Sequence, residues 1–268
     1  MIQRVIRTTA IIAVGISGCF SQTALPPSLN RMPILVELFT SEGCSSCPPA
    51  DRFLAALDGQ PIPGTELIVL SEHVDYWDRL GWKDPFSSQE ISERQAMYAR
   101  QLHIPDVYTP QMVVDGRRQF SGGNIPAGEQ AIHEAMLDPR VSLQLSTVSI
   151  EGSRVRVHLE SPSLDAKIGP RSLDVFVAIA LNRAESQVER GENAKHRLTH
   201  VAVVRKLVRV GKLKVGQSLS RDIEVKIGPE ANSQDLRVVI FLQDSNSGKI
   251  FGAAMKAGAS RQAVNLHE

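Results

Sequence analysis

Apolar and polar residues follow two different patterns along the chain. Between residues 33 and 140, short apolar runs alternate with segments whose apolar residues recur at helical spacing. The apolar runs predict strands at residues 34–39, 66–71, 107–116 and 117–121. The helical spacing covers residues 50–57, 87–103 and 127–137. After residue 140, about seven segments rich in Val, Ile and Leu are separated by turn residues, with no helical pattern between them.

The order of these elements predicts the fold class. Strands joined by a helix are expected to be parallel, and Asp115-Gly116 predicts a hairpin between the last two strands of the first part. The order strand, helix, strand, helix, strand, strand, helix predicts an α/β thioredoxin-like domain at residues 33–140. The later strands predict an all-β, sandwich-like (immunoglobulin-like) domain at residues 141–268. We therefore expect two domains in series.

The N-terminal segment is typical of an export signal. A basic start precedes an apolar stretch that is too short to span a membrane stably. The stretch ends at Ile16-Ser17-Gly18-Cys19, which resembles the bacterial lipobox. We expect a signal peptide at residues 1–18, lipidation of Cys19 and a tether at residues 19–32. The alternative is an ordinary signal peptide cleaved near Ala24. Both interpretations predict an exported protein of the periplasm or cell envelope.

Charge and cysteine content narrow the classes of partner. The chain has 30 Lys and Arg against 29 Asp and Glu, so nothing in the balance suggests nucleic acid as a partner. If Cys19 is lipidated or removed, Cys44 and Cys47 are the remaining cysteines. A single close pair does not make a scaffold stapled by disulfides. The pair can serve redox chemistry, bind a metal or form a local clip.

Cys44 and Cys47 lie where the first predicted strand passes into the first predicted helix. The helix dipole is positive at that end and backbone N–H groups lack partners, which favours a thiolate. We expect Cys44 to attack a substrate disulfide and Cys47 to resolve the mixed disulfide. The only cofactor expected is this redox-active Cys44–Cys47 disulfide, and the alternatives are a structural disulfide or a metal clip.

At two further positions the type of residue is unusual for the expected local structure. Glu37 stands inside an apolar strand, where burial of a charge is costly, and the alternative is a solvated strand edge. Pro110 follows Thr109 at the start of an apolar strand, where proline is disfavoured. In thioredoxin-like proteins, a buried acid handles the proton of the resolving thiol. A cis-proline there faces the cysteines, and the residue before it pairs with bound polypeptide.

The loop after the second strand concentrates aromatic and polar side chains and holds both tryptophans. It is expected to open at the same sheet end as the cysteines, as a wall or a substrate groove. Together with Thr109, the residues predicted to contact substrate are His73, Asp75, Tyr76, Trp77 and Trp82. The alternative is a loop packed by its own aromatic residues. A polar link at residues 189–200 either docks against the first domain or is solvated.

Taken together, these stretches resemble the exported bacterial thioredoxin-like family known as domain of unknown function twelve-twenty-three. The resemblance extends over about residues 33–257, and the matching motifs lie at residues 37–51, 73–86, 108–111, 190–193 and 241–244. The family has no settled activity. The resemblance therefore implies export and a thioredoxin-like fold, and it does not name a reaction.

The leading hypothesis is an extracytoplasmic thiol–disulfide oxidoreductase. Its partners would be protein thiols or disulfides, or a redox partner protein, and a lipid on Cys19 would anchor it to the membrane. A second hypothesis is a soft-metal protein in which Cys44, Cys47 and His73 bind Cu(I). A third is a non-enzymatic envelope protein with a structural disulfide, which binds its partner through the β-rich part.

Overall fold

The computed structural model describes residues 31–60, 62–227, 235–257 and 259–260. The predicted signal peptide at residues 1–18, lipidation at Cys19 and most of the predicted tether lie outside the described residues. Arg31–Glu268 form one compact unit. None of the helices in the described ranges is both long and apolar enough to cross a membrane.

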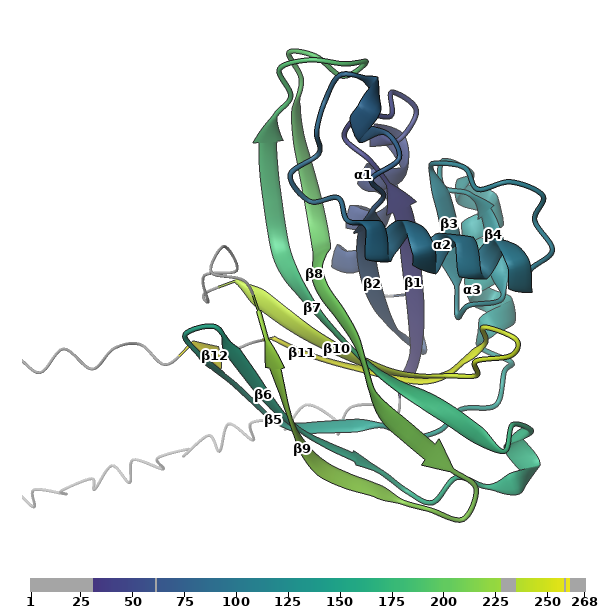
Figure 1. Cartoon of the computed structure of the whole chain (residues 1–268). Helices are drawn as coiled ribbons and strands as arrows, with labels where there is room; N and C mark the ends of the chain where they lie inside the picture. Colours follow the sequence, from purple (N-terminus) through teal and green to yellow (C-terminus); the bar gives the residue numbers. More distant parts are fainter. Residues whose placement is uncertain (1–30, 61, 228–234, 258, 261–268) are drawn as a thin grey trace, which may run out of the picture. The chain divides into compact units, whose positions relative to one another are not determined.

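The first part of the chain folds into strands and helices in the predicted order. The elements are β1 (Met32–Thr40), α1 (Pro48–Gly59), β2 (Thr65–His73), the 3-10 turn η1 (Asp78–Leu80), α2 (Gln89–Gln101), β3 (Gln111–Val114), β4 (Arg118–Ser121) and α3 (Ile125–Ala135) (Figure 1). β1 is parallel to β2 and antiparallel to β3, and β3 and β4 form the expected hairpin.

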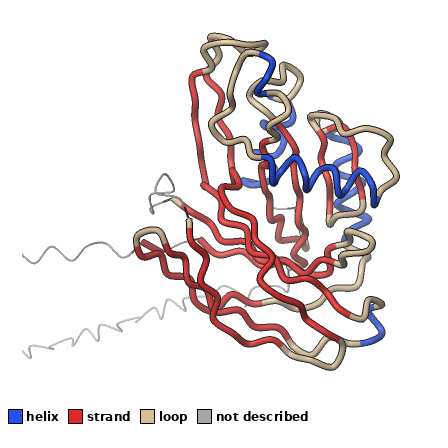
Figure 2. Tube along the Cα trace, viewed as in Figure 1, coloured by secondary structure: helices blue, strands red, loops and turns tan. Residues whose placement is uncertain are grey.

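The second part is built from strands, as its apolar segments predict, with one short 3-10 turn. The elements are β5 (Gln144–Glu151), β6 (Arg154–Ser161), η2 (Ala166–Ile168), β7 (Ser172–Gln187), β8 (Arg197–Lys214), β9 (Leu219–Lys226), β10 (Leu236–Gln243), β11 (Ile250–Ala257) and β12 (Ala259–Ser260). Figure 2 shows how strands dominate the described chain.

The predicted fold class, an α/β thioredoxin-like domain followed by a separate sandwich-like domain, is wrong. Strands from both parts share one mixed sheet of eight strands, in the order β11-β10-β7-β8-β2-β1-β3-β4. The junction is a parallel pairing of β2 with β8, at Ser71 and Val203. The described residues contain three α-helices, so the protein is mostly β. A hydrophobic pattern identifies a strand but not its neighbour, and this explains the error.

The length of β7 and β8 provides the physical reason for the joined sheet. These two strands have 16 and 18 residues, well above the usual strand length of about 5–6 residues. At one end they pack over the smaller sheet, which has the order β12-β5-β6-β9. Farther along, β8 pairs with β2, and the tip of the hairpin reaches the loop after β2 (Figure 1).

Three apolar cores surround the large sheet. One lies between the two sheets and includes Val157, Leu159 and Ile240. The other two lie on opposite faces of β1, because successive side chains of a strand point to opposite faces. Leu38 packs with α1 and α3, whereas Phe39 packs with α2 and β10. Each fully buried side chain of this size stabilises the fold by about 1.5–3 kcal/mol.

Candidate functional site

The predicted cysteine pair is a disulfide that connects Cys44 to Cys47. After β1 ends, a turn brings Cys44 N to the carbonyl of Ser41 at 3.1 Å, and Cys47 directly precedes α1. Proline occupies the start of that helix, where a backbone N–H would lack a helical partner in any case. Both cysteines are fully buried, whereas Ser45 and Ser46 between them are exposed.

The connection between β7 and β8, residues 188–196, covers this turn, and we call it the cover loop. The amide of Asn193 donates hydrogen bonds to the carbonyls of Glu42 and Cys44, both at 2.9 Å. The backbone N–H of Ser45 donates to the carboxylate of Glu192 at 3.0 Å, and this bonding lowers the pKa of Glu192. The polar link at residues 189–200 is therefore docked here and is not a freely solvated loop.

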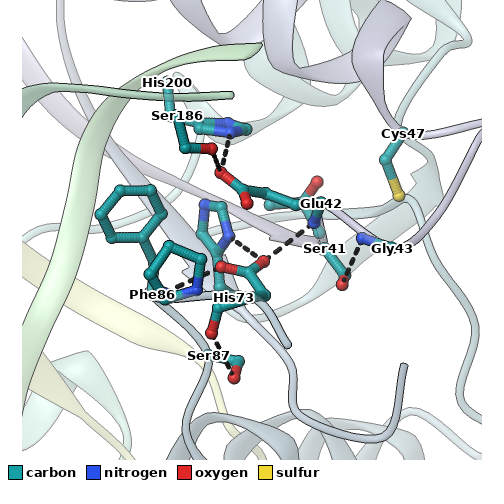
Figure 3. Close-up of polar contacts among 12 residues, drawn as sticks. Ser41, Glu42, Gly43, Cys47, His73, Phe86, Ser87, Ser186 and His200 are labelled. Atoms are coloured by element: carbon teal, nitrogen blue, oxygen red, sulfur yellow. Dashed lines mark hydrogen bonds and ion pairs between the residues drawn. The ribbon is translucent and has the colours of Figure 1, made fainter. Parts of the chain in front are cut away.

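Beneath the cysteine turn lies a group of buried acids and imidazoles that we call the Glu42 cluster: Glu42, Asp51, His73, Asp84 and His200. Glu42 Oε2 accepts a hydrogen bond from Trp82 Nε1 at 2.7 Å, and its Oε1 accepts one from Ser186. The backbone N–H of Glu42 donates to Asp84 Oδ2 at 2.8 Å. Figure 3 shows Glu42, His73, Ser186 and His200 converging from separate segments.

His73 makes two contacts within the cluster, one with the carboxylate of Asp84 and one with the imidazole ring of His200. Its Nδ1 lies 2.7 Å from Asp84 Oδ2, and its ring meets the ring of His200 edge to face at 4.6 Å. Burial raises the pKa of Asp84, but the charge and hydrogen bond of His73 and two backbone N–H groups outweigh burial, so this pKa lies below its ordinary value. His73 Nε2 is buried without a hydrogen-bond partner. His73 is thus a buried residue that helps to hold the cysteine turn through Asp84.

His200, on β8, stands between two carboxylates. Its Nε2 lies 3.4 Å from Glu42 Oε1 and its Nδ1 lies 3.7 Å from Asp51 Oδ1. Burial lowers the pKa of His200, but the bonding and charges of Asp51 and Glu42 outweigh it and raise this pKa to about 10. The distances exceed those of well-formed hydrogen bonds, so the attraction is mainly that of an ion pair. His200 is therefore a cation at neutral pH.

Asp51 links the Glu42 cluster to the helix that follows the disulfide. Its backbone N–H donates to the carbonyl of Cys47 at 3.1 Å, which places it one helical turn beyond that cysteine. Its Oδ1 accepts a hydrogen bond from the hydroxyl of Thr40 at 3.0 Å. The end of β1 and the start of α1 are thereby held together behind the disulfide.

Several residues predicted to contact substrate lie near the cysteine turn. The Thr109–Pro110 bond is cis, so the special geometry predicted for this proline is confirmed. Trp77 Nε1 donates to the hydroxyl of Thr109 at 2.8 Å. A side chain added at Gly43 would stand 3.2 Å from Cβ of Trp77, so this tryptophan packs directly against the turn. The roles of these residues in substrate binding stay predictions.

Asp75 and Tyr76 lie elsewhere. Asp75 bonds with the hydroxyl of Ser92 in α2, and the hydroxyl of Tyr76 donates to Gln95 at 3.2 Å. Burial raises the pKa of Tyr76. Both side chains thus bond the loop to α2, whereas Trp77 and Trp82 face the cysteine turn. Whether the loop forms a substrate groove stays a prediction.

Glu37 is buried, so the interpretation of a solvated strand edge is wrong. Its carboxylate accepts hydrogen bonds from Arg94 Nε at 2.7 Å and from the hydroxyl of Tyr98 at 2.6 Å. Both partners belong to α2, on the face of the sheet opposite to α1. The described contacts of this carboxylate are with α2 and not with Cys47, and its role in proton handling stays a prediction.

Sequence reasoning missed Glu42, Asp51, Asp84, Asn193 and His200 as members of the site. Glu42 and Asp51 belong to the motif at residues 37–51, but an acid in a polar turn or at a helix start is ordinary. Asn193 lies in the quoted motif at residues 190–193, whose docking site a sequence cannot show. His200 carried no signal, because only the fold brings it beside Glu42.

The soft-metal hypothesis, with Cys44, Cys47 and His73 as ligands, stays a prediction. The sulfur atoms of Cys44 and Cys47 are bonded to each other. Within the described ranges, no group of three or more His, Cys, Asp or Glu side chains is arranged to hold a metal ion.

Comparison with known proteins places the chain in a family. It is similar to the crystal structure of a protein from Agrobacterium tumefaciens, with 27% identity and a TM-score of 0.63, covering 87% of this chain and 97% of that one. It also shares its fold with HBP35 of Porphyromonas gingivalis, with 14% identity and a TM-score of 0.61, covering 88% and 80%. No curated protein sequence matches it. Residues 35–243 match the model of the family described as "Protein of unknown function (DUF1223)", and the chain belongs to this family.

Proposed function

We propose that this protein is an extracytoplasmic thiol–disulfide oxidoreductase whose reacting group is the Cys44–Cys47 disulfide. The observation that carries the proposal is this disulfide at the start of α1, braced from behind by a buried cluster of acids and imidazoles.

The reaction exchanges one disulfide for another. In the direction that oxidises the protein, the Cys44 thiolate attacks a substrate disulfide, forms a mixed disulfide and releases one substrate thiolate. Cys47 then attacks the sulfur of Cys44, reforms the disulfide and releases the second substrate thiolate. Two electrons and two protons pass to the substrate. The reverse sequence oxidises a substrate dithiol, and the proposal covers both directions.

The surroundings of Cys44 support its role as the attacking thiol. Its sulfur lies 3.4 Å from the hydroxyl of Ser46, which can donate a hydrogen bond to a thiolate. The positive end of the α1 dipole acts in the same direction. Cys47 lies at the N-cap of α1 and leads into its first turn, which suits a resolving thiol.

Access to the disulfide requires the cover loop to move. Both cysteines are fully buried, and Asn193 and Glu192 hold the cover with three hydrogen bonds. Such bonds contribute about 0.5–1.5 kcal/mol each, so the loop can open at a cost of a few kcal/mol. The proposed cycle therefore begins with opening of the cover loop, and a protein substrate with an accessible thiol or disulfide is the partner.

Export and lipid anchoring at Cys19 belong to the same proposal. A disulfide such as Cys44–Cys47 persists in an oxidising compartment, which agrees with export. The lipidation motif at residues 16–19 would keep the protein at a membrane surface.

Trapping of the mixed disulfide tests the proposal. We would incubate mature Cys47→Ser and Cys44→Ser proteins with a disulfide-bonded protein substrate and identify adducts by mass spectrometry. The Cys47→Ser variant should accumulate a mixed disulfide at Cys44, whereas the Cys44→Ser variant should accumulate far less. Wild-type protein that does not accelerate exchange, together with no adduct in either variant, would contradict the proposed function.

A further inference from the structure

One groove is not used by the proposed reaction, and part of the cover loop forms one of its walls. It has a volume of about 450 Å3 and lies between residues 78–83, in the loop after β2, and residues 189–190, at the tip of the β7–β8 hairpin. Glu192, two residues farther along, bonds to the exposed Ser45 between the two cysteines. The groove therefore adjoins the only exposed part of the Cys44–Cys47 turn.

The walls of the groove are fixed by close packing. A side chain at Gly81 would stand 3.7 Å from the backbone of Gly191, and one at Gly191 would stand 3.2 Å from Cβ of Trp82. Both glycines have positive φ, 108° and 79°, which other residues rarely adopt. Trp82 is held in turn by its hydrogen bond to Glu42. With the cover loop closed, the two loops thus form one continuous surface.

The charges along the groove favour an anionic ligand. Arg79, Lys83 and Arg190 are exposed, and none of them forms an ion pair within the described ranges. Asp78 also lines the groove, but its carboxylate accepts hydrogen bonds from Asp84 N at 3.2 Å and Ser87 Oγ at 2.9 Å within its own loop. Glu189 is the remaining opposing charge.

A second hollow of similar size differs from the groove in how its charged residues are paired. On the face of β6 and β9 lies a hollow of about 480 Å3. Its charged residues satisfy one another: Arg156 pairs with Glu224 at 3.1 Å and His158 with Asp222 at 2.7 Å. Cations that already have partners gain little from a ligand. In the groove, by contrast, Arg79, Lys83 and Arg190 have no ion-pair partner among the described residues.

We propose that this groove binds an acidic segment of the polypeptide whose cysteine reacts with the Cys44–Cys47 pair. The inference rests on the proposed function. A polypeptide that presents a cysteine to this turn must pass its flanking residues over the neighbouring surface, and that surface carries Arg79, Lys83 and Arg190. Several weak surface ion pairs together give a preference of about tenfold for an acidic over a neutral segment.

The test uses mature full-length protein and three labelled peptides without cysteine, matched in length. The first carries acidic residues, the second their amide counterparts and the third lysines, and binding is followed by fluorescence anisotropy. We expect the acidic peptide to bind about tenfold more tightly than the amide peptide, with a preference that weakens as salt rises. The Arg79→Glu, Lys83→Glu, Arg190→Glu variant should instead prefer the basic peptide.

The matched control is Lys214→Glu, an exposed charge reversal at the far end of β8, which should bind as wild type does. Because charge reversal can perturb folding, the triple glutamine variant and a thermal melt accompany the experiment. Glutamine substitution should remove the preference without reversing it. Equal affinities for all three peptides would overturn the inference. So would displacement of the acidic peptide by inorganic phosphate at equal charge concentration, which indicates a small-anion site.

The same peptides with an added disulfide separate the two proposals. If disulfide exchange occurs without any preference for acidic flanking residues, the proposed function stands and the proposed binding of an acidic segment in the groove is wrong. Binding of the acidic peptide without any exchange would support the groove as a docking surface and contradict the oxidoreductase.

Discussion

Two buried polar clusters flank the large sheet, and they are satisfied in different ways. The first, the Arg94 cluster, comprises Glu37, Glu72, Arg94, Tyr98 and Gln243. Arg94 donates to Glu37, Tyr98 and Gln243, and its guanidinium lies 5.1 Å from the ring of Phe241. The second is the Glu42 cluster under the cysteine turn. There, the cation His200 lies 3.4 Å from Glu42 and 3.7 Å from Asp51, whereas Arg94 donates to Glu37 at 2.7 Å. Among the described residues, both clusters contain polar atoms without a hydrogen-bond partner: the carboxylate oxygens of Glu72 in the first, and both ring nitrogens of His200 and one of His73 in the second.

This difference separates a structural cluster from a candidate functional one. In the Arg94 cluster, burial and the charge of Glu37 raise the pKa of Glu72 well above its ordinary value, and Arg94 forms its short ion pair with Glu37. That cluster connects α2 and β1 to β10. The Glu42 cluster is held by longer ion pairs and lies beneath the Cys44–Cys47 disulfide.

The largest expected effect is on the Arg94 cluster. Arg94→Met removes the cation and leaves Glu37 buried without its partner, which should lower the free energy of unfolding by about 3–5 kcal/mol. Denaturant unfolding measures the loss. The double variant Glu37→Leu, Arg94→Met should recover part of it, because no buried charge is then left alone. A loss below about 1 kcal/mol in Arg94→Met would contradict a structural role.

The next effect is the pH dependence that His200 introduces. Because its folded pKa is raised to about 10, its stabilising contribution is complete below about pH 6.5 and is lost as pH rises through 10. At neutral pH, His200→Gln should lower the free energy of unfolding by at most about 4 kcal/mol. Unfolding curves of both proteins between about pH 6.5 and 10 should converge as pH rises. A constant difference between them would show that His200 is not a buried cation.

Removal of the disulfide should cost less than the loss of Arg94. The two cysteines are three positions apart, so the closed loop is short and its entropic contribution is only about 2 kcal/mol. The Cys44→Ser, Cys47→Ser variant should therefore remain folded, as thermal unfolding and circular dichroism can establish. Global unfolding of this variant would indicate that the disulfide is required for the fold.

The smallest effect concerns the cover loop. Asn193→Ala removes two hydrogen bonds, which should lower the free energy of unfolding by about 1–2 kcal/mol. It should also accelerate reduction of the disulfide by dithiothreitol several-fold. Asn182→Ala is the matched control, because Asn182 lies on β7 and bonds to Arg237, away from the cysteines. Equal reduction rates in all three proteins would show that the cover loop does not limit access.

Sequence alone predicted the local elements well and their assembly poorly. The burial of Glu37, the special Thr109–Pro110 geometry and the Cys44–Cys47 pair each follow from a residue type that is out of place in its local pattern. The pairing of β2 with β8 leaves no such mark, because the apolar residues around Ser71 and Val203 show that each segment is buried but not which strand lies beside it. It is this long-range pairing that produces the eight-stranded sheet.

For the same reason, the sequence could not predict that the residues of the Glu42 cluster come together. Glu42, His73, Asp84 and His200 come from four separate segments, and each residue has an ordinary local explanation. The face of β1 on which Glu37 lies follows from alternation with Leu35 and Phe39. Alternation does not show which helix covers that face, since α1 and α2 both carry apolar stripes.

The most direct test of the account is the reduction potential of the Cys44–Cys47 disulfide. Mature protein would be equilibrated in glutathione or dithiothreitol buffers of graded potential, and the free thiols would be trapped by alkylation and counted. The account predicts a value between about −120 and −270 mV, the span of dedicated thiol–disulfide oxidoreductases. A value below about −300 mV would identify a structural disulfide and contradict the proposed function.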